Sequence, residues 1–217
     1  LPETGWNIDI GIRGKLLDDH WQYDIAVYTI FISNMLVTER AAEDIFTGIN
    51  AGETRLSGLE MFNEIEFGHP SASIQPTLTS AIFFSNNEFT RFVDDGNDYG
   101  GNALPGIPAQ IINTTLNINI KNMVYFSAEM RYSGRQFMND ANTLEYEGHL
   151  VGNSSIAWQV PINTLPFGIE ITADVNNVFN TNYASMILIN APSGGTAPRY
   201  YYPGMPRNFM IGLRVRN

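Results

Sequence analysis

Large apolar residues recur at every second position along many segments of the chain. The clearest segment is 6–15, where Trp6, Ile8, Ile10 and Ile12 alternate with Asn7, Asp9, Gly11, Arg13 and Lys15. A period of two places alternate side chains on opposite faces of a β-strand. This segment is therefore predicted to be a strand with one apolar and one polar face.

The last segment of the chain shows the same alternation. Its apolar positions are Phe209, Ile211, Leu213 and Val215, and they are separated by Met210, Gly212, Arg214 and Arg216. In a soluble sheet a second protein layer covers such an apolar face, whereas in a transmembrane barrel the face lies against lipid. We expect lipid to cover the apolar face here.

Seven further strands are expected, which makes nine in all. They are predicted over residues 21–31, 55–67, 77–86, 112–120, 124–132, 150–160 and 167–175. Consecutive alternating segments joined by short polar turns are typical of antiparallel hairpins. The segment 77–86 carries apolar side chains on both faces, with Ala81 and Phe83 opposite Ile82 and Phe84, so either face could meet lipid.

The connections between these strands alternate between short turns and long loops. The long ones follow Phe31, Asn86, Tyr132 and Val175. We expect residues 37–53 to be irregular and 88–109 to form the longest loop. Outer-membrane barrels have short periplasmic turns and long outer loops, and a strand of about 11 residues tilted by about 40° crosses their apolar band.

The polar face of the segment 112–120 consists of amides and hydroxyls, namely Asn113, Thr115, Asn117 and Asn119. Neutral hydrogen-bonding groups suit the wet or plugged interior of a wide barrel, whereas a soluble sandwich would carry charges on its exposed face. The predicted fold class is therefore all-β, an antiparallel transmembrane β-barrel. A secreted β-sandwich binding module is the alternative from another class.

Composition excludes several functions. Charged residues make up 16% of the chain, and the 12 basic residues are outnumbered by 22 acidic ones. Nucleic acid is not expected as a partner, because phosphate binding needs clustered Lys and Arg. The chain has no cysteine, so it contains neither disulfides nor thiolate metal sites. It also has no apolar run of about 18 residues that could form a transmembrane helix.

Neither a catalytic site nor a metal or cofactor site is expected. His20, His69 and His149 lack metal-ligand spacing, and no nucleophile motif, phosphate loop or dinucleotide fingerprint occurs. The acidic run 94–98 could suggest calcium. We interpret it as a flexible acidic loop, because Pro105 stands where an EF-hand would place its closing Glu.

Several motifs resemble those of TonB-dependent outer-membrane receptors. They are Pro-Glu before Asn7, Gly11, Arg13 and Gly14; Asn50 to Glu60; Leu104-Pro105 to Pro108; Arg131 to Asn142; Asn176-Asn177-Val178-Phe179-Asn180 to Tyr183; and Tyr200 to Arg216. They occur in the order that this family has, at the ends of the predicted strands. The resemblance is to siderophore and cobalamin receptors rather than to glycan importers.

This resemblance implies a larger assembly and an active transport function. Barrels of the family have 22 strands around a plug, so residues 1–217 would be the C-terminal part of the barrel, and the plug and the N-terminal strands would lie outside this chain. The implied function is energy-coupled uptake of a scarce ligand, such as a siderophore, another metal chelate or cobalamin. A TonB-type energy-transducing complex would act through the plug, in the outer membrane of a Gram-negative bacterium. A passive diffusion porin is the alternative within the membrane class.

Ligands of this family meet the outer loops and the upper lumen. Aromatic and guanidinium groups in or beside the long loops are therefore the candidate ligand contacts, namely Arg91, Phe92, Tyr99, Tyr146, Tyr200 and Tyr201. The alternative is that these side chains form an interfacial aromatic belt or stabilise the loops.

Overall fold

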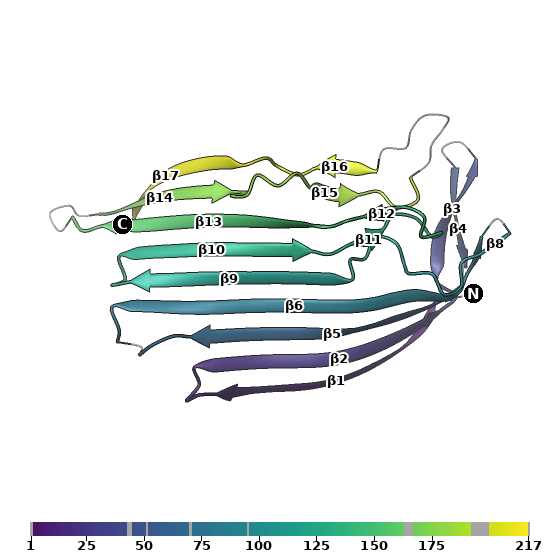
Figure 1. Cartoon of the computed structure of the whole chain (residues 1–217), viewed down its shortest axis with the longest axis horizontal. Coiled ribbons are helices and arrows are strands. Elements are labelled where there is room, and N and C mark those ends of the chain that lie inside the picture. The colour runs from purple at the N-terminus through teal and green to yellow at the C-terminus, as the bar shows by residue number, and fades with distance from the viewer. Residues whose placement is uncertain are drawn as a thin grey trace.

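The structure, a computed structural model, describes residues 2–42, 45–50, 52–69, 71–94, 96–162, 167–191 and 200–216. Nine strands form one antiparallel sheet in which each strand pairs with the next one along the sheet (Figure 1). They are β1 (Thr4–Leu16), β2 (Trp21–Ser33), β5 (Glu53–Glu66), β6 (Ile74–Arg91), β9 (Gln110–Ile120), β10 (Val124–Ser133), β13 (His149–Val160), β14 (Gly168–Asn176) and β17 (Asn208–Arg216). The predicted strand number and antiparallel all-β class are confirmed.

The register aligns apolar side chains of neighbouring strands in continuous rows. One row runs through Ile12, Ile25, Met61, Ile82, Ile112, Tyr132 and Leu150. Because a slip of one residue would move a whole strand's side chains to the other face, these rows determine the orientation of every strand. They settle the ambiguous strand β6, which turns Ile82 and Phe84 to the apolar face and Ala81 and Phe83 to the polar one.

No described part of the chain covers the apolar face of the sheet. Trp6, Ile10 and Ile211 expose 79%, 71% and 86% of their surface. Among the described residues no second sheet packs on this face, since the other sheets are two-stranded hairpins in the connections. The architecture is therefore not a β-sandwich, and lipid is the solvent that suits this face. No helix in the described part of the chain is long and apolar enough to cross a bilayer.

Asn63 interrupts the apolar face of β5, and its side-chain amide is hydrogen-bonded by a residue of the neighbouring strand. The indole Nε1–H of Trp21 donates a hydrogen bond to Asn63 Oδ1 at 3.2 Å. The rings of Trp21 and Tyr23 lie 5.7 Å apart, beside the short turn that joins β1 to β2. Aromatic side chains with one polar group favour the membrane–water interface, so this group indicates the interface on the turn side.

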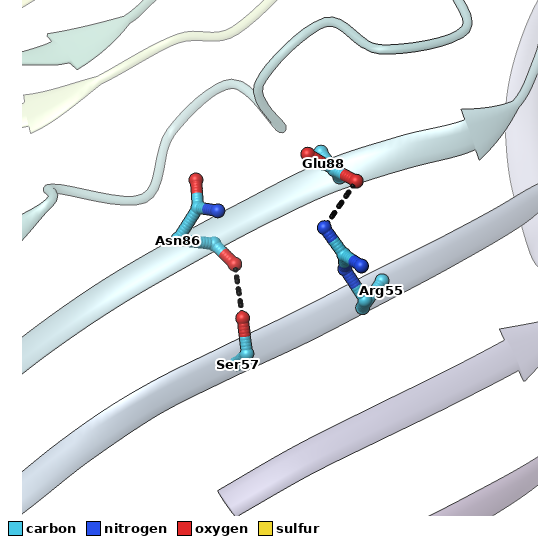
Figure 2. A network of polar contacts seen from close by, with 4 residues as sticks. All are labelled: Arg55, Ser57, Asn86 and Glu88. Carbon is cyan, nitrogen blue, oxygen red and sulfur yellow. Dashed lines mark hydrogen bonds and ion pairs between the residues drawn. The ribbon is translucent and has the colours of Figure 1, made fainter.

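Charged residues mark the other border of the apolar face. Figure 2 shows Arg55 and Ser57 of β5 beside Asn86 and Glu88 of β6, with an Arg55–Glu88 ion pair of 2.8 Å. Ser57 Oγ donates to the backbone oxygen of Asn86 at 3.0 Å. These residues continue the rows of the apolar face toward the long connections. Because charges are costly in hydrocarbon, the apolar band ends below this pair.

The long connections all lie at one end of the strands, at the right of Figure 1, and they contain more strand than expected. Residues 37–53 were expected to be irregular, but β3 (Leu36–Ala42) pairs with β4 (Ile45–Asn50). Three further hairpins are β7 (Val93–Asp94) with β8 (Asn97–Asp98), β11 (Gln136–Phe137) with β12 (Glu145–Tyr146), and β15 (Ala184–Ile187) with β16 (Tyr201–Pro203). Loop arms that pair with each other satisfy backbone groups that would otherwise need water.

The expectation that 88–109 is the longest loop is wrong. Strand β6 continues to Arg91, because its outer end pairs with the loop that follows: Phe89 N donates to Asn102 O and Leu104 N to Asn87 O, both at 2.9 Å. The connection between β14 and β17, residues 177–207, is the longest.

The sheet is open at both sides within the described residues. Strand β1 pairs only with β2, and β17 pairs only with β14, at opposite edges of the sheet in Figure 1. The structure is thus an arc of barrel wall with a lipid face, an inner polar face, and loops at one end.

Candidate ligand-binding site at the outer loops

A small apolar core anchors the loop that follows β6. Phe89, Phe92 and Leu104 are buried to 4%, 3% and 7% exposure, and Leu56, Tyr99 and Ile107 pack around them. Leu56 and Phe89 belong to the inner face of β5 and β6. The loop 92–109 therefore folds onto the inner face of the wall at its outer end, which narrows the opening of the lumen.

Asp140 joins three outer connections. Its backbone oxygen accepts a hydrogen bond from Asn102 Nδ2 at 2.8 Å, and its carboxylate Oδ2 accepts one from Asn190 Nδ2 at 2.8 Å. Its backbone N–H donates to Asn190 Oδ1 at 3.1 Å. Asn142 adds a bidentate contact, because its amide both accepts from Ala103 N and donates to Ala103 O. The three loops are therefore tied to one another through amide and carboxylate groups.

The hydrogen-bonded junction of the three loops around Asp140 is expected to be more stable at acid pH. Burial raises the pKa of Asp140, the negative charge of Asp94 raises it further, and the hydrogen bond from Asn190 opposes both. Because the pKa in the folded loop lies above that in an unfolded loop, the folded junction binds the proton more tightly. Its stability should be highest below the unfolded pKa and should fall as the pH rises through the folded pKa.

Asp140→Asn should therefore stabilise the junction at neutral pH and remove this pH dependence. The asparagine keeps an oxygen that can accept from Asn190 but carries no charge. Hydrogen-exchange protection factors of residues 138–142 and 187–191, each corrected for the intrinsic exchange rate, provide the measurement. Asp18→Asn, in a turn at the opposite end of the sheet, is the control. Stronger protection of the wild-type loops at pH 7.5 than at pH 5 would contradict this prediction.

A cluster of aromatic side chains lies where β13 meets the outer loops. The rings of His149 and Tyr183 stack with centroids 4.9 Å apart, and Tyr146 lies 5.8 Å from Tyr201, which in turn is 6.3 Å from Tyr200. Tyr146 Oη lies 3.2 Å from His149 Nδ1 and accepts from the Ala184 N–H at 2.9 Å. The hydroxyl can therefore donate its own hydrogen to His149.

The cluster lies at the inner face and beside a cation. His149 pairs with Ser133 on the inner face of β10, the face to which Arg131 also belongs. Arg131 is exposed, and its positive charge repels positive charge on the His149 ring. Tyr201 exposes 52% of its surface. An exposed ring such as that of Tyr201 can stack on a planar ligand, and a guanidinium beside it can bind the negative charge of that ligand.

The structure divides the predicted ligand contacts into two groups. Tyr146, Tyr200 and Tyr201 come together in the aromatic cluster. Arg91 forms an ion pair with Glu53 at 3.0 Å, and the rings of Phe92 and Tyr99 pack 5.6 Å apart in the loop core. Nearly all of Phe92 is buried, so that side chain supports the loop rather than facing the lumen.

Sequence reasoning missed His149 and Tyr183 as members of the cluster. His149 is the first residue of β13, and Tyr183 ends the motif that begins at Asn176. The sequence therefore places each residue at the start of an outer connection or strand, but no sequence pattern indicates that their rings touch. In the described part of the chain no three His, Asp or Glu side chains are grouped as metal ligands. Asp98, in the acidic run, accepts instead from Gly100 N at 2.9 Å and so stabilises its own turn.

Comparison with known proteins identifies the family. Residues 1–178 match the family described as TonB dependent receptor-like, beta-barrel. The chain belongs to the TonB-dependent receptor family. The resemblance that its motifs showed is thus confirmed, and the open nine-stranded sheet is a portion of the family's barrel. Membership places the receptor in the Gram-negative outer membrane, in a family of transport receptors rather than enzymes.

Solved structures show the same fold at low sequence identity. The chain is similar to the ferric yersiniabactin uptake receptor FyuA from Yersinia pestis, with 19% identity, a TM-score of 0.71, and coverage of 99% of this chain and 30% of that one. For the siderophore receptor PiuA from Acinetobacter baumannii the identity is 17% and the TM-score 0.72, with coverage of 98% of this chain and 28% of that one. For BauA, the ferric preacinetobactin receptor from Acinetobacter baumannii, the identity is 16% and the TM-score 0.70, with coverage of 97% of this chain and 29% of that one. The chain thus spans less than a third of each of these proteins.

Proposed function

We propose that the receptor takes up a metal chelate by active, energy-coupled transport across the outer membrane. The observation that carries this proposal is the aromatic cluster beside Arg131, half-buried except for the exposed Tyr201, at the outer end of the inner wall of a TonB-dependent receptor barrel. A ligand arriving from outside would meet this cluster before the rest of the lumen. The polar inner face below it offers amides and hydroxyls along which a hydrated ligand can move.

The site favours a planar, anionic chelate of the siderophore type over cobalamin. Tyr146, Tyr183 and Tyr201 offer ring faces, and Arg131 offers a charge that binds carboxylate or phenolate oxygens. FyuA and BauA are named as receptors for ferric chelates, and PiuA as a siderophore receptor, which agrees with this chemistry. Arg91, Phe92 and Tyr99 would then shape the rim from the neighbouring loop.

The proposed partners follow from the open sheet and the family. The free edges of β1 and β17 would pair with the N-terminal strands of a 22-stranded barrel, for which this chain is the C-terminal part. A plug domain would occupy the lumen, and a TonB-type energy-transducing complex would act on that plug. Lipid would cover the apolar face.

A passive porin and an active importer differ in their need for energy. For the full-length receptor in outer membranes, we expect uptake of a ⁵⁵Fe-labelled catecholate or carboxylate chelate to stop when the proton-motive force is dissipated. Binding of the same chelate to the cell surface should persist. Uptake that continues unchanged without the proton-motive force would contradict active import and favour the porin.

The same assay tests the binding site. Tyr146→Ala with Tyr201→Ala should weaken chelate binding by roughly tenfold to a hundredfold, because aromatic side chains contribute a large part of binding energy. Tyr125→Ala is a matched control, since Tyr125 lies on the inner face near the short turns and its hydroxyl donates to Asn122 O. Unchanged affinity after alanine substitution of Arg91, Phe92, Tyr99, Tyr146, Tyr200 and Tyr201 together would exclude all six as ligand contacts.

A further inference from the structure

His149 differs from the other two histidines of the chain in its surroundings. His20 and His69 lie in short turns at the opposite end of the sheet, whereas His149 begins β13 on the inner face, within the aromatic cluster. Its side chain is half-buried. Imidazole is the side chain whose charge ordinarily changes near neutral pH. His149 is therefore the residue through which this cluster can change its charge.

The backbone before His149 fixes the position of the ring. Gly148 has a φ of +89°, and a Cβ atom at this position would collide with the backbone oxygen of Ser133 on the neighbouring strand β10. Only glycine allows the chain to approach β10 so closely in this conformation. The ring of Tyr183 stacks on the imidazole, with centroids 4.9 Å apart. The imidazole is thus held both through its backbone and at its ring face.

The hydrogen bonds of Tyr146 determine which nitrogen of His149 carries the proton. Tyr146 Oη accepts from the Ala184 N–H at 2.9 Å, so its own hydrogen can be donated to His149 Nδ1, 3.2 Å away. A ring nitrogen that accepts a hydrogen bond carries no hydrogen, so the ring is neutral and its proton is on Nε2. In the part of the chain that the structure describes, Nε2–H has no acceptor. This donor is therefore available to a ligand.

Positive charge from β10 keeps the His149 ring neutral while the site holds no anion. Arg131 is exposed on the same inner face, and its guanidinium disfavours a second positive charge on the ring. The nearby carboxylates have other surroundings: Glu129 of β10 accepts from a β13 amide at 3.0 Å, Glu145 of β12 pairs with an arginine at 3.7 Å, and Glu147 is exposed. An anion that enters the site would offset the charge of Arg131.

We propose that His149 selects an anionic ligand by taking up a proton when that ligand binds. A negatively charged oxygen of the chelate accepts from Nε2–H and lies beside Arg131, so it offsets the charge that kept the ring neutral. The new proton, taken from solvent, binds to Nδ1 and is donated to Tyr146 Oη. The hydroxyl hydrogen of Tyr146 then turns to a second oxygen of the ligand. One proton enters the site and none leaves it.

This inference rests on the proposed function, because it assigns the chemistry of the same ligand site. It favours chelates with charged oxygens, such as catecholates and carboxylates, over uncharged ones. Since the liganded site binds the proton more tightly than the empty site, affinity for an anionic chelate should rise as the pH falls, by at most about tenfold per pH unit. An uncharged chelate does not change the charge that the ring prefers, so its affinity should not depend on pH.

Calorimetric titration of the full-length receptor in detergent tests this proton uptake. The probes are the ferric complex of a tris-catecholate, which is multiply negative, and that of a tris-hydroxamate, which is uncharged. Titration in two buffers of different ionisation enthalpy counts the protons taken up. We expect uptake approaching one proton with the catecholate, and weaker binding without proton uptake with the hydroxamate. Catecholate binding without proton uptake, no catecholate binding, or proton uptake with the hydroxamate overturns the proposal.

His149→Gln separates the proton from the hydrogen bond. Glutamine keeps an amide N–H for the ligand but cannot take up a proton. Catecholate affinity at pH 7.5 should therefore stay within several-fold of the wild-type value, while the proton uptake and the rise in affinity toward pH 6 should be lost. His69→Gln, in a turn at the opposite end of the sheet, is the matched control and should keep both. Undiminished proton uptake in His149→Gln overturns the proposal. Resistance to SDS at room temperature shows that each variant is folded.

Energy-dependent uptake of the same catecholate by the wild type, measured in parallel, separates the two proposals. Energy-dependent transport without proton uptake on binding refutes the role of His149 alone. Proton uptake on binding without energy-dependent transport refutes the transport function and leaves the role of His149 standing.

Discussion

Leu116→Arg should lower the free energy of unfolding of the full-length receptor in lipid by about 2–4 kcal/mol, the cost of Arg on the lipid face of a barrel near the bilayer midplane. Leu116 lies in the middle of β9 and is flanked in its row by Leu78 of β6 and Ala128 of β10. These neighbours offer the guanidinium neither a hydrogen-bond acceptor nor a negative charge. Urea titration of the receptor reconstituted in phospholipid vesicles, followed by tryptophan fluorescence, provides the measurement.

Thr115→Arg is the matched control, because it introduces the same side chain one position earlier on the same strand. Thr115 belongs to the inner face, where Glu129 of β10 lies directly opposite. The new guanidinium can reach water and this carboxylate, so the change in unfolding free energy should stay within about 0.5 kcal/mol, as for most surface substitutions. An equal loss of stability in the two variants would show that the faces of β9 have been assigned wrongly.

Alternation predicted most of the nine strands, because a barrel strand has one face in lipid and one in a polar interior, whereas the segment 77–86 was predicted from its position between its neighbours. In β1, β9, β10 and β17 the two faces differ so clearly that the sequence also predicted which side chains meet lipid. Strand β6 could not be oriented in this way, because it has a phenylalanine on each face: Phe83 stacks on Tyr28 at the inner face, and Phe84 lies on the lipid face. Only the pairing with β5 and β9 distinguishes them.

The outer loops were harder to predict because contacts between distant residues determine their structure. Asp140 bonds Asn102 and Asn190, which are 38 and 50 residues away in the chain, and no local pattern shows such pairs. The candidate site was predicted in part for the same reason. Aromatic side chains near loops are visible in the sequence, yet their contacts decide that Phe92 enters a core while Tyr146 joins Tyr201 and His149.

This chain expressed without the rest of the receptor should fail to form a stable barrel. The edges of β1 and β17 each present a row of backbone N–H and C=O groups that have no partner among the described strands. In hydrocarbon each unsatisfied group costs several kcal/mol, so an open arc in a bilayer is far less stable than a closed barrel. We expect the chain alone to aggregate or to unfold in SDS at room temperature, whereas the full-length receptor should migrate as a compact, heat-modifiable band.

Supplying the absent strands as a separate polypeptide should restore the compact band, because the two edges would then be paired. Closure of the chain on itself is the competing outcome, and cysteines at Ile10 and Ile211 detect it. The chain has no natural cysteine, so a disulfide between these positions in a monomer would form only if β1 met β17. An SDS-resistant monomer of this chain with that disulfide would refute the larger barrel. It would also leave too narrow a lumen for a plug, because barrel diameter grows with the number of strands.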